Sequence, residues 1–251
     1  MSGFDWLPWR RPPPPIDDAL WRDALAACPL AQRLAPDVRQ RLRLFAAHFL
    51  QRKRFFPIDT KLDPMQRLLI AMQACVPVLN SGFRMLRGWQ SVIVYPGEFR
   101  VRHRHHDDST GVVTERDEVL SGESWQAGPL VLSWAAVQQD LLQPWDGFNV
   151  VVHEIAHKLD MLDGPPDGVP PLPRVIGWRK WIEAFQRAYD RLSDDVQLGH
   201  ATLIDPYAAT NPGEYFAVVS ELHFSDPRRL GQAESEVAAL LQAYYGPSPA
   251  P

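Results

Sequence analysis

The sequence has few cysteines and lacks a long apolar run. Its 251 residues include two cysteines, Cys28 and Cys75, both in apolar, helix-like contexts. A disulfide framework is thereby excluded, and two core thiols are expected. The longest apolar stretch, residues 68–79, is interrupted by Gln73 and Pro77 and is too short to cross a bilayer. No membrane association is therefore expected.

Long runs of charge of one sign are also absent. The chain has 26 Lys and Arg against 30 Asp and Glu, a formal net charge of -4. Nothing indicates a phosphate-binding surface, so nucleic acid is not an expected partner. The first residues lack the continuous apolar segment of a secretory signal and run into four prolines at 12–15. A cytoplasmic protein with a substantial core is predicted.

Hydrophobic periodicity predicts one α+β domain. Residues 1–15 form a proline-rich lead-in, and residues 16–251 form the domain. Its first part, about 16–85, has helical spacing, and the rest, about 90–246, contains a small mixed or antiparallel sheet followed by helices. The predicted later helices are at 149–162, 175–192, 212–223 and 233–245.

The stretch NVVVHEIAHKLD contains the pattern HExxH on a predicted helix with Asn149 as its N-cap. His153 and His157 are four residues apart, so both imidazoles project from one face and can bind the same ion. Glu154 lies one position round the helix, where it can take a proton from a water activated by zinc. The alternative is a half-buried amphipathic helix with two unrelated histidines. The helical context favours the metal site.

A catalytic zinc site needs a third protein ligand, for which two residues compete. Asp163 follows His157 by six residues, as the third ligand does in the metzincin pattern. However, Asp160 occupies that pattern's glycine position, and no methionine follows Met161 to form its Met-turn. Glu214 follows Asn-Pro-Gly at the start of a predicted helix, where it is either a ligand or the N3 residue of a capping box. These alternatives stay open on physical grounds.

Several other residues are weaker candidates. Asp160 lies on the same helix face as His157 and can accept a hydrogen bond from a ligand imidazole, or it is a solvated acid. Tyr207, after Asp-Pro, is typical of a packed turn, but beside a zinc site its hydroxyl can donate to a tetrahedral intermediate. Nothing singles out His200 or His223 for the same role.

Two segments before the HExxH helix also carry possible functions. His103, His105 and His106 lie in a predicted hairpin, where a second metal site is conceivable, but no neighbouring residue completes a coordination set and a solvated loop is expected. Residues 129–134 read as a strand. If this strand is an exposed edge, it can hydrogen-bond an extended peptide beside the zinc site.

Three motifs, in order, carry a resemblance to a known family. They are LSGESWQAGPLVLSW, HEIAHKLDMLDG and DPYAATNPGEYFAVVSE, within a similarity that extends from residue 68 to the 220s. Together they resemble the Mlc titration factor A family of zinc metallopeptidases. That family is of the gluzincin type, and its fold is similar to the catalytic domain of anthrax lethal factor. The resemblance therefore implies a zincin-like catalytic domain.

The resemblance also implies roles for individual residues. His153 and His157 bind one zinc ion per chain, with Glu214 as the third ligand. Glu154 acts as the general base, and Tyr207 lies near the zinc, where its phenol can stabilise the oxyanion.

The favoured function is a zinc-dependent peptidase acting on short peptides or accessible protein ends. The resemblance adds an aminopeptidase-like preference and association with a transcriptional repressor of sugar uptake. An alternative is a regulator-binding protein that acts by sequestering a transcription factor. A purely structural zinc protein is disfavoured, because Glu154 would then have no chemical purpose.

Overall fold

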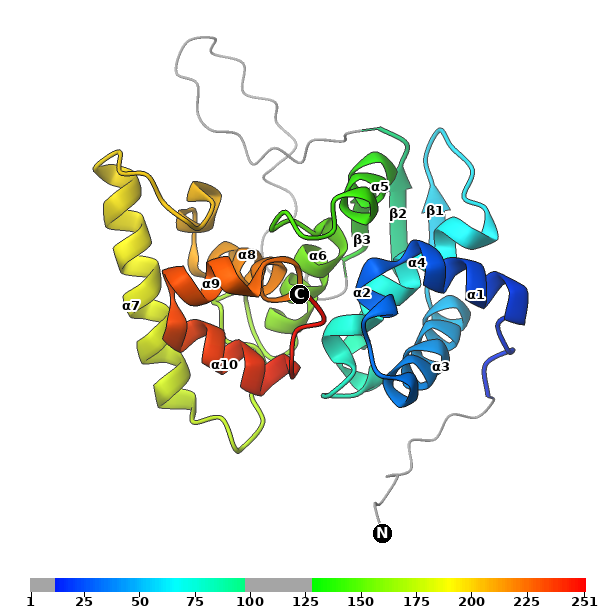
Figure 1. The fold of residues 1–251 in the computed structure, drawn as a ribbon, viewed down its shortest axis with the longest axis horizontal. Helices are drawn as coiled ribbons and strands as arrows, with labels where there is room; N and C mark the ends of the chain where they lie inside the picture. The colour runs from blue at the N-terminus through cyan, green and yellow to red at the C-terminus, as the bar shows by residue number, and fades with distance from the viewer. Residues whose placement is uncertain (1–11, 98–127) are drawn as a thin grey trace.

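The computed structural model describes residues 12–97 and 128–251. The N-terminal helices and a small sheet lie on one side of the molecule, the C-terminal helices lie on the other, and helix α6 lies between them (Figure 1). The helices are α1 (Asp18–Ala27), α2 (Pro29–Gln32), α3 (Pro36–Arg52), α4 (Pro64–Cys75), α5 (Trp134–Leu142), α6 (Val150–Asp160), α7 (Trp178–Gln197), α8 (Pro212–Ser225), α9 (Pro227–Ala233) and α10 (Ser235–Tyr245). Short 3-10 turns are η1 (Val76–Val78), η2 (Phe83–Leu86) and η3 (Pro206–Ala209).

The described strands form one sheet in the order β1 (Arg54–Pro57), β2 (Ser91–Tyr95) and β3 (Leu130–Ser133). An α+β class with a small sheet agrees with the sequence prediction. Both strand pairs are parallel, whereas mixed or antiparallel pairing was expected. The β1–β2 connection contains α4, and parallel strands need such a crossover connection. The predicted β-like runs between residues 98 and 127 lie outside the described residues.

Other elements pack against helix α6 on both sides, and its apolar face is fully buried. The predicted core-facing residues have no exposed surface: Val152, Ile155, Ala156 and Leu159. Asn149 is the N-cap, as predicted, and its Oδ1 accepts from the backbone N of Val152 at 2.9 Å. The helix ends at Asp160, two residues earlier than expected.

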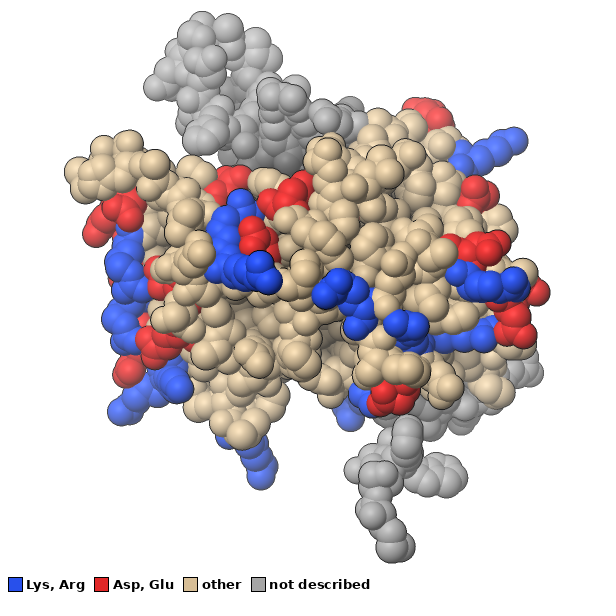
Figure 2. Space-filling view, in the orientation of Figure 1, with Lys and Arg blue, Asp and Glu red and all other residues tan. Residues whose placement is uncertain are grey.

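The C-terminal helices enclose α8, which is buried from Gly213 to Ser225. Trp181 of α7 stacks on Phe185 at a ring-centroid distance of 4.3 Å. The opposite side of α7 is exposed, and Figure 2 shows basic and acidic side chains alternating along it. Arg187, for example, pairs with Glu236 of α10 at 2.8 Å. Because α8 is buried along its length, it is a core element, and packing on several sides sets its position.

Both cysteines are free and buried, as predicted. Within the described parts of the chain, no helix combines the length and apolarity that crossing a membrane would require.

Candidate metal site

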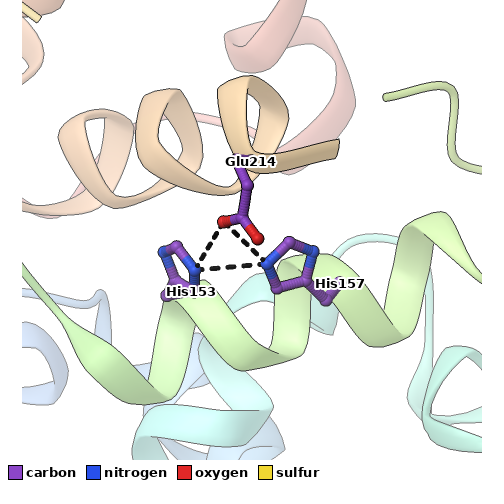
Figure 3. Close-up of side chains that lie close together, drawn as sticks. All are labelled: His153, His157 and Glu214. Carbon is purple, nitrogen blue, oxygen red and sulfur yellow. Dashed lines mark hydrogen bonds and ion pairs between the residues drawn. The ribbon is translucent and has the colours of Figure 1, made fainter. Parts of the chain in front are cut away.

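Helices α6 and α8 bring three potential metal ligands together. His153 and His157 project from one face of α6, and Glu214 points toward them from the first turn of α8 (Figure 3). The three side chains are mostly buried, with 14%, 16% and 7% of their side-chain surface exposed. Their donor atoms all lie within 4.8 Å of one another.

The spacing of these atoms fits a tetrahedral metal ion. The Nε2 atoms of His153 and His157 are 3.2 Å apart, and Oε2 of Glu214 is 3.2 Å from each of them. Zinc bonds of about 2.0–2.2 Å in a tetrahedron place neighbouring ligand atoms about 3.3–3.6 Å apart. An ion therefore fits at the centre of this site with little movement, and the fourth position of the tetrahedron is left for water or substrate.

The contacts of Glu214 bear on the two roles considered for it. Asn211 is the N-cap of α8, and its Oδ1 accepts from the backbone N of Glu214 at 2.9 Å. The Glu214 carboxylate itself is directed at the two imidazoles. The cap of α8 thus acts on the backbone of Glu214, while its carboxylate faces the two imidazoles.

The electrostatics of the site favour a cation between these groups. Burial raises the pKa of Glu214, but hydrogen bonds from His153 and His157 outweigh it and hold that pKa well below its usual range. Burial lowers the pKa of His153, yet the carboxylates of Glu221 and Glu214 raise it well above its ordinary value. Acidic oxygens thus surround the imidazole nitrogens, an arrangement that also suits a divalent ion.

Comparison with known proteins places this chain in a family. Residues 6–246 match the family described as glucose-regulated metallo-peptidase M90. The chain belongs to this metallopeptidase family. It is 37% identical over 249 residues to Mlc titration factor A of Escherichia fergusonii, covering 96% of this chain and 91% of the relative.

Two further relatives extend this similarity. Mlc titration factor A of Salmonella arizonae is 41% identical over 216 residues, which cover 84% of this chain and 83% of the relative. An uncharacterized protein of Synechocystis is 40% identical over 248 residues, with 96% and 89% coverage. The family resemblance seen in the sequence motifs is thereby confirmed.

A fourth residue, the acid Glu221, contacts the site and was not predicted. Its Oε1 lies 2.7 Å from Nδ1 of His153, on the side of the ring opposite the metal-facing nitrogen. Glu221 follows Glu214 by seven residues, which is two helical turns, so both project from the same face of α8. That spacing was the available signal in the sequence.

The structure corrects the expectation for Asp160. Oδ2 accepts from the backbone N of Gly168 at 2.9 Å, and neither carboxylate oxygen bonds an imidazole of the described residues. Gly168 has a φ of +81°, and a Cβ there would lie 2.8 Å from the backbone O of Pro212. Asp160 therefore fixes the loop that packs against the start of α8, rather than orienting His157 directly.

Replacing Asp160 with asparagine is expected to change the pH dependence of stability. Burial raises the pKa of Asp160 to about 7, so the folded protein holds this proton over a pH range in which the unfolded chain has released it. Its contribution to stability is therefore largest at low pH and declines between about pH 4 and 7, by up to about 1.4 kcal/mol per pH unit. Asp160→Asn removes that decline.

Thermal unfolding of wild type and Asp160→Asn, from pH 5 to 8 in the same buffers, tests this. The melting temperature of the variant should rise relative to that of wild type as the pH increases. A constant difference between the two proteins would show that Asp160 ionises in the folded state at its ordinary pKa.

Tyr207 lies close to the site in η3. Asp205 caps this turn by accepting from the backbone N of Tyr207 at 2.8 Å. The Tyr207 ring centroid is 6.3 Å from that of His153. Burial raises the pKa of the phenol, and the negative charge of Glu214 raises it further. The hydroxyl therefore stays protonated and remains a hydrogen-bond donor.

The remaining candidates do not join the site. Asp163 is absent from the described group of potential metal ligands. His200 pairs with Asp195 at 3.0 Å on the surface, and buried His223 packs against Tyr245. The predicted histidine cluster at 103–106 lies outside the described residues.

Proposed function

We propose that the protein is a zinc-dependent peptidase whose metal is held by His153, His157 and Glu214. The observation that carries this proposal is the triangle of ligand atoms with 3.2 Å sides on an HExxH helix. Two imidazoles and one carboxylate with an open fourth position are the ligand set of known catalytic zinc peptidase sites. Membership of a metallopeptidase family supports the same conclusion.

His153, His157 and Glu214 would hold the zinc ion, which when bound would supply Lewis-acid activation of a water molecule and of the scissile carbonyl. Glu154 takes the proton of the attacking water and passes it to the departing amine. Its negative charge is one of the smaller causes that raise the pKa of His153 and of Tyr207. The neutral phenol of Tyr207 donates a hydrogen bond to the oxyanion that develops on the carbonyl.

Strand β3 is a suitable support for an extended substrate. Among the described strands it pairs with β2 on one side only. It also packs against α6, which carries the histidines. A peptide added along the free side of this strand would run beside the ligand helix. The proposed preference for aminopeptidase substrates has a different basis, because it rests on the family resemblance and not on strand β3.

Hydrolysis of a panel of chromogenic aminoacyl amides and N-blocked short peptides tests the proposed activity. Wild type stripped of metal with a chelator should be inactive and should recover when stoichiometric zinc is added. Cleavage of the unblocked substrates alone would support the aminopeptidase preference. Absence of hydrolysis in protein with zinc bound would contradict the proposed peptidase.

Tyr207→Phe is expected to reduce kcat by about 10²–10³-fold, because one oxyanion donor is lost. Zinc affinity should remain close to that of wild type, since the variant keeps all three ligands and the ring. Steady-state kinetics together with metal titration measure both quantities. An unchanged kcat would remove Tyr207 from the catalytic machinery.

A second function is favoured by the names of the relatives. Several relatives are called Mlc titration factor A, which suggests that this chain binds a transcriptional repressor. The catalytically impaired Glu154→Gln variant separates the two functions when repressor release from its operator DNA is measured with each protein. Full release by the variant would make sequestration the main function, and loss of release would tie the effect to hydrolysis.

A further inference from the structure

Glu221 connects a metal-site histidine to the end of the helix that carries it. One carboxylate oxygen, Oε1, lies 2.7 Å from Nδ1 of His153. The other, Oε2, accepts from the backbone N of Asn149 at 2.6 Å. Glu221 is only 6% exposed and Asn149 only 4%. Both carboxylate oxygens are therefore used in a buried environment, where their bonds have a well-defined geometry.

The hydrogen bonds continue into the N-terminal helices. The Asn149 amide donates through Nδ2 to Oε1 of Gln73 at 2.8 Å, while its Oδ1 caps α6. Gln73 is 1% exposed and lies in the last turn of α4, where the surrounding residues are apolar. This buried bond explains why a polar residue interrupts the longest apolar stretch of the sequence. Helix α4 thus contributes to the position of the α6 N-terminus.

The two bonds of Glu221 define which nitrogen of His153 is available to a metal. A carboxylate only accepts hydrogen bonds, so a neutral imidazole beside it carries its proton on Nδ1. The lone pair is then on Nε2, which is the nitrogen that faces His157 and Glu214. A glutamine amide cannot replace this carboxylate, because its NH₂ group would face either His153 Nδ1 or the backbone N–H of Asn149.

We propose that Glu221 is a positioning residue of the metal site, held by Asn149 and Gln73, that fixes His153 in the orientation and tautomer that bind metal through Nε2. This inference rests on the metal site of the proposed function. It extends that function from the ligands to a buried chain of side chains that reaches α4. Partners of this kind orient ligands in metal sites, and their loss weakens metal binding by about 10–100-fold.

The test compares Glu221→Gln with Asp140→Asn in the full-length protein. Asp140 is a buried acid that also accepts from the start of α6, at the backbone N of Val150 (2.7 Å), but its side chain contacts no metal ligand. Both variants therefore replace a buried acid near the same helix end with its amide. Zinc affinity is measured by competition with a chelator, and the melting temperature of metal-free protein is measured alongside it.

Glu221→Gln should weaken zinc binding by about 10–100-fold, and Asp140→Asn should bind zinc nearly as wild type does. In zinc-loaded wild type labelled with ¹⁵N-histidine, the proton on Nδ1 of His153 should be protected from exchange, and in Glu221→Gln it should exchange rapidly. Equal zinc affinity in wild type and Glu221→Gln would overturn the role of Glu221. Equal weakening by both variants would also overturn it, since the effect would then come from the helix end.

Gln73→Met keeps the test decisive if Glu221→Gln fails to fold. This nearly isosteric change releases the Asn149 side chain and leaves every metal ligand and Glu221 in place. Zinc affinity should fall by less than in Glu221→Gln but measurably, and restoring an acceptor with Gln73→Glu should recover part of it. No change in Gln73→Met would exclude α4 from the positioning chain. If wild type binds no zinc, the proposed metal site itself fails, a result distinct from these.

Discussion

Glu154→Gln is expected to lower peptide hydrolysis by about 10²–10⁴-fold while leaving zinc binding intact. The glutamine has nearly the same shape but cannot accept the proton of the attacking water. Glu154 is not among the three converging ligands, so the metal should stay bound. The expected pattern is a loss in kcat, with a KM close to that of wild type.

Activity and zinc content of the same preparations measure this effect. Glu183→Gln, at an exposed position on α7, is the matched control and should behave as wild type. Hydrolysis by Glu154→Gln within a few-fold of wild type would show that another group takes the proton. Loss of zinc in the variant would instead make Glu154 a ligand and contradict the proposed mechanism.

Among the proposed variants, Glu214→Gln is expected to produce the largest fall in zinc affinity. The loss should exceed the decrease of about 10–100-fold that is expected when a residue that only orients a ligand is replaced. The variant replaces the only charged member of the ligand set with a neutral amide. The helix start should remain formed, because the cap is provided by the Asn211 side chain acting on the backbone of residue 214. Hydrolysis should be lost together with zinc.

The matched variant Asn211→Ala separates the two roles that the sequence left open. Loss of this cap should reduce the free energy of unfolding by about 1 kcal/mol, with zinc affinity little changed. Chelator competition and thermal unfolding of both variants distinguish ligand from cap. If Glu214→Gln binds zinc as wild type does and only loses stability, Glu214 is a structural residue.

The HExxH helix was predictable because its signals are local. The N-cap at Asn149 and the i, i+3, i+4 spacing of apolar residues define its start and its buried face. The pairing of β1 was not predictable, since RFFP directly follows a long helix and its partner β2 is far along the chain. Helix α9 was also missed, because its seven residues give too short a pattern.

The metal site shows the same division between local and long-range information. His153 and His157 share one helix, so their spacing alone indicated a common ion. The approach of the Glu214 carboxylate to both imidazoles depends on the packing of α8 on α6, which the sequence pattern does not contain. Sequence reasoning left Asp160 open between an acid that bonds a ligand imidazole and a solvated acid, whereas Asp160 bonds the backbone of Gly168 and the acid beside His153 is Glu221. Contacts between distant helices are not encoded in the spacing of residues along one helix.

Anomalous diffraction at the zinc edge from crystals of the zinc-loaded protein tests the central claim most directly. We expect one strong peak within about 2.0–2.2 Å of Nε2 of His153, Nε2 of His157 and a carboxylate oxygen of Glu214. A fourth ligand from solvent should complete the tetrahedron. A peak at other residues, or none at this triangle with zinc in excess, would contradict the assignment of the metal site.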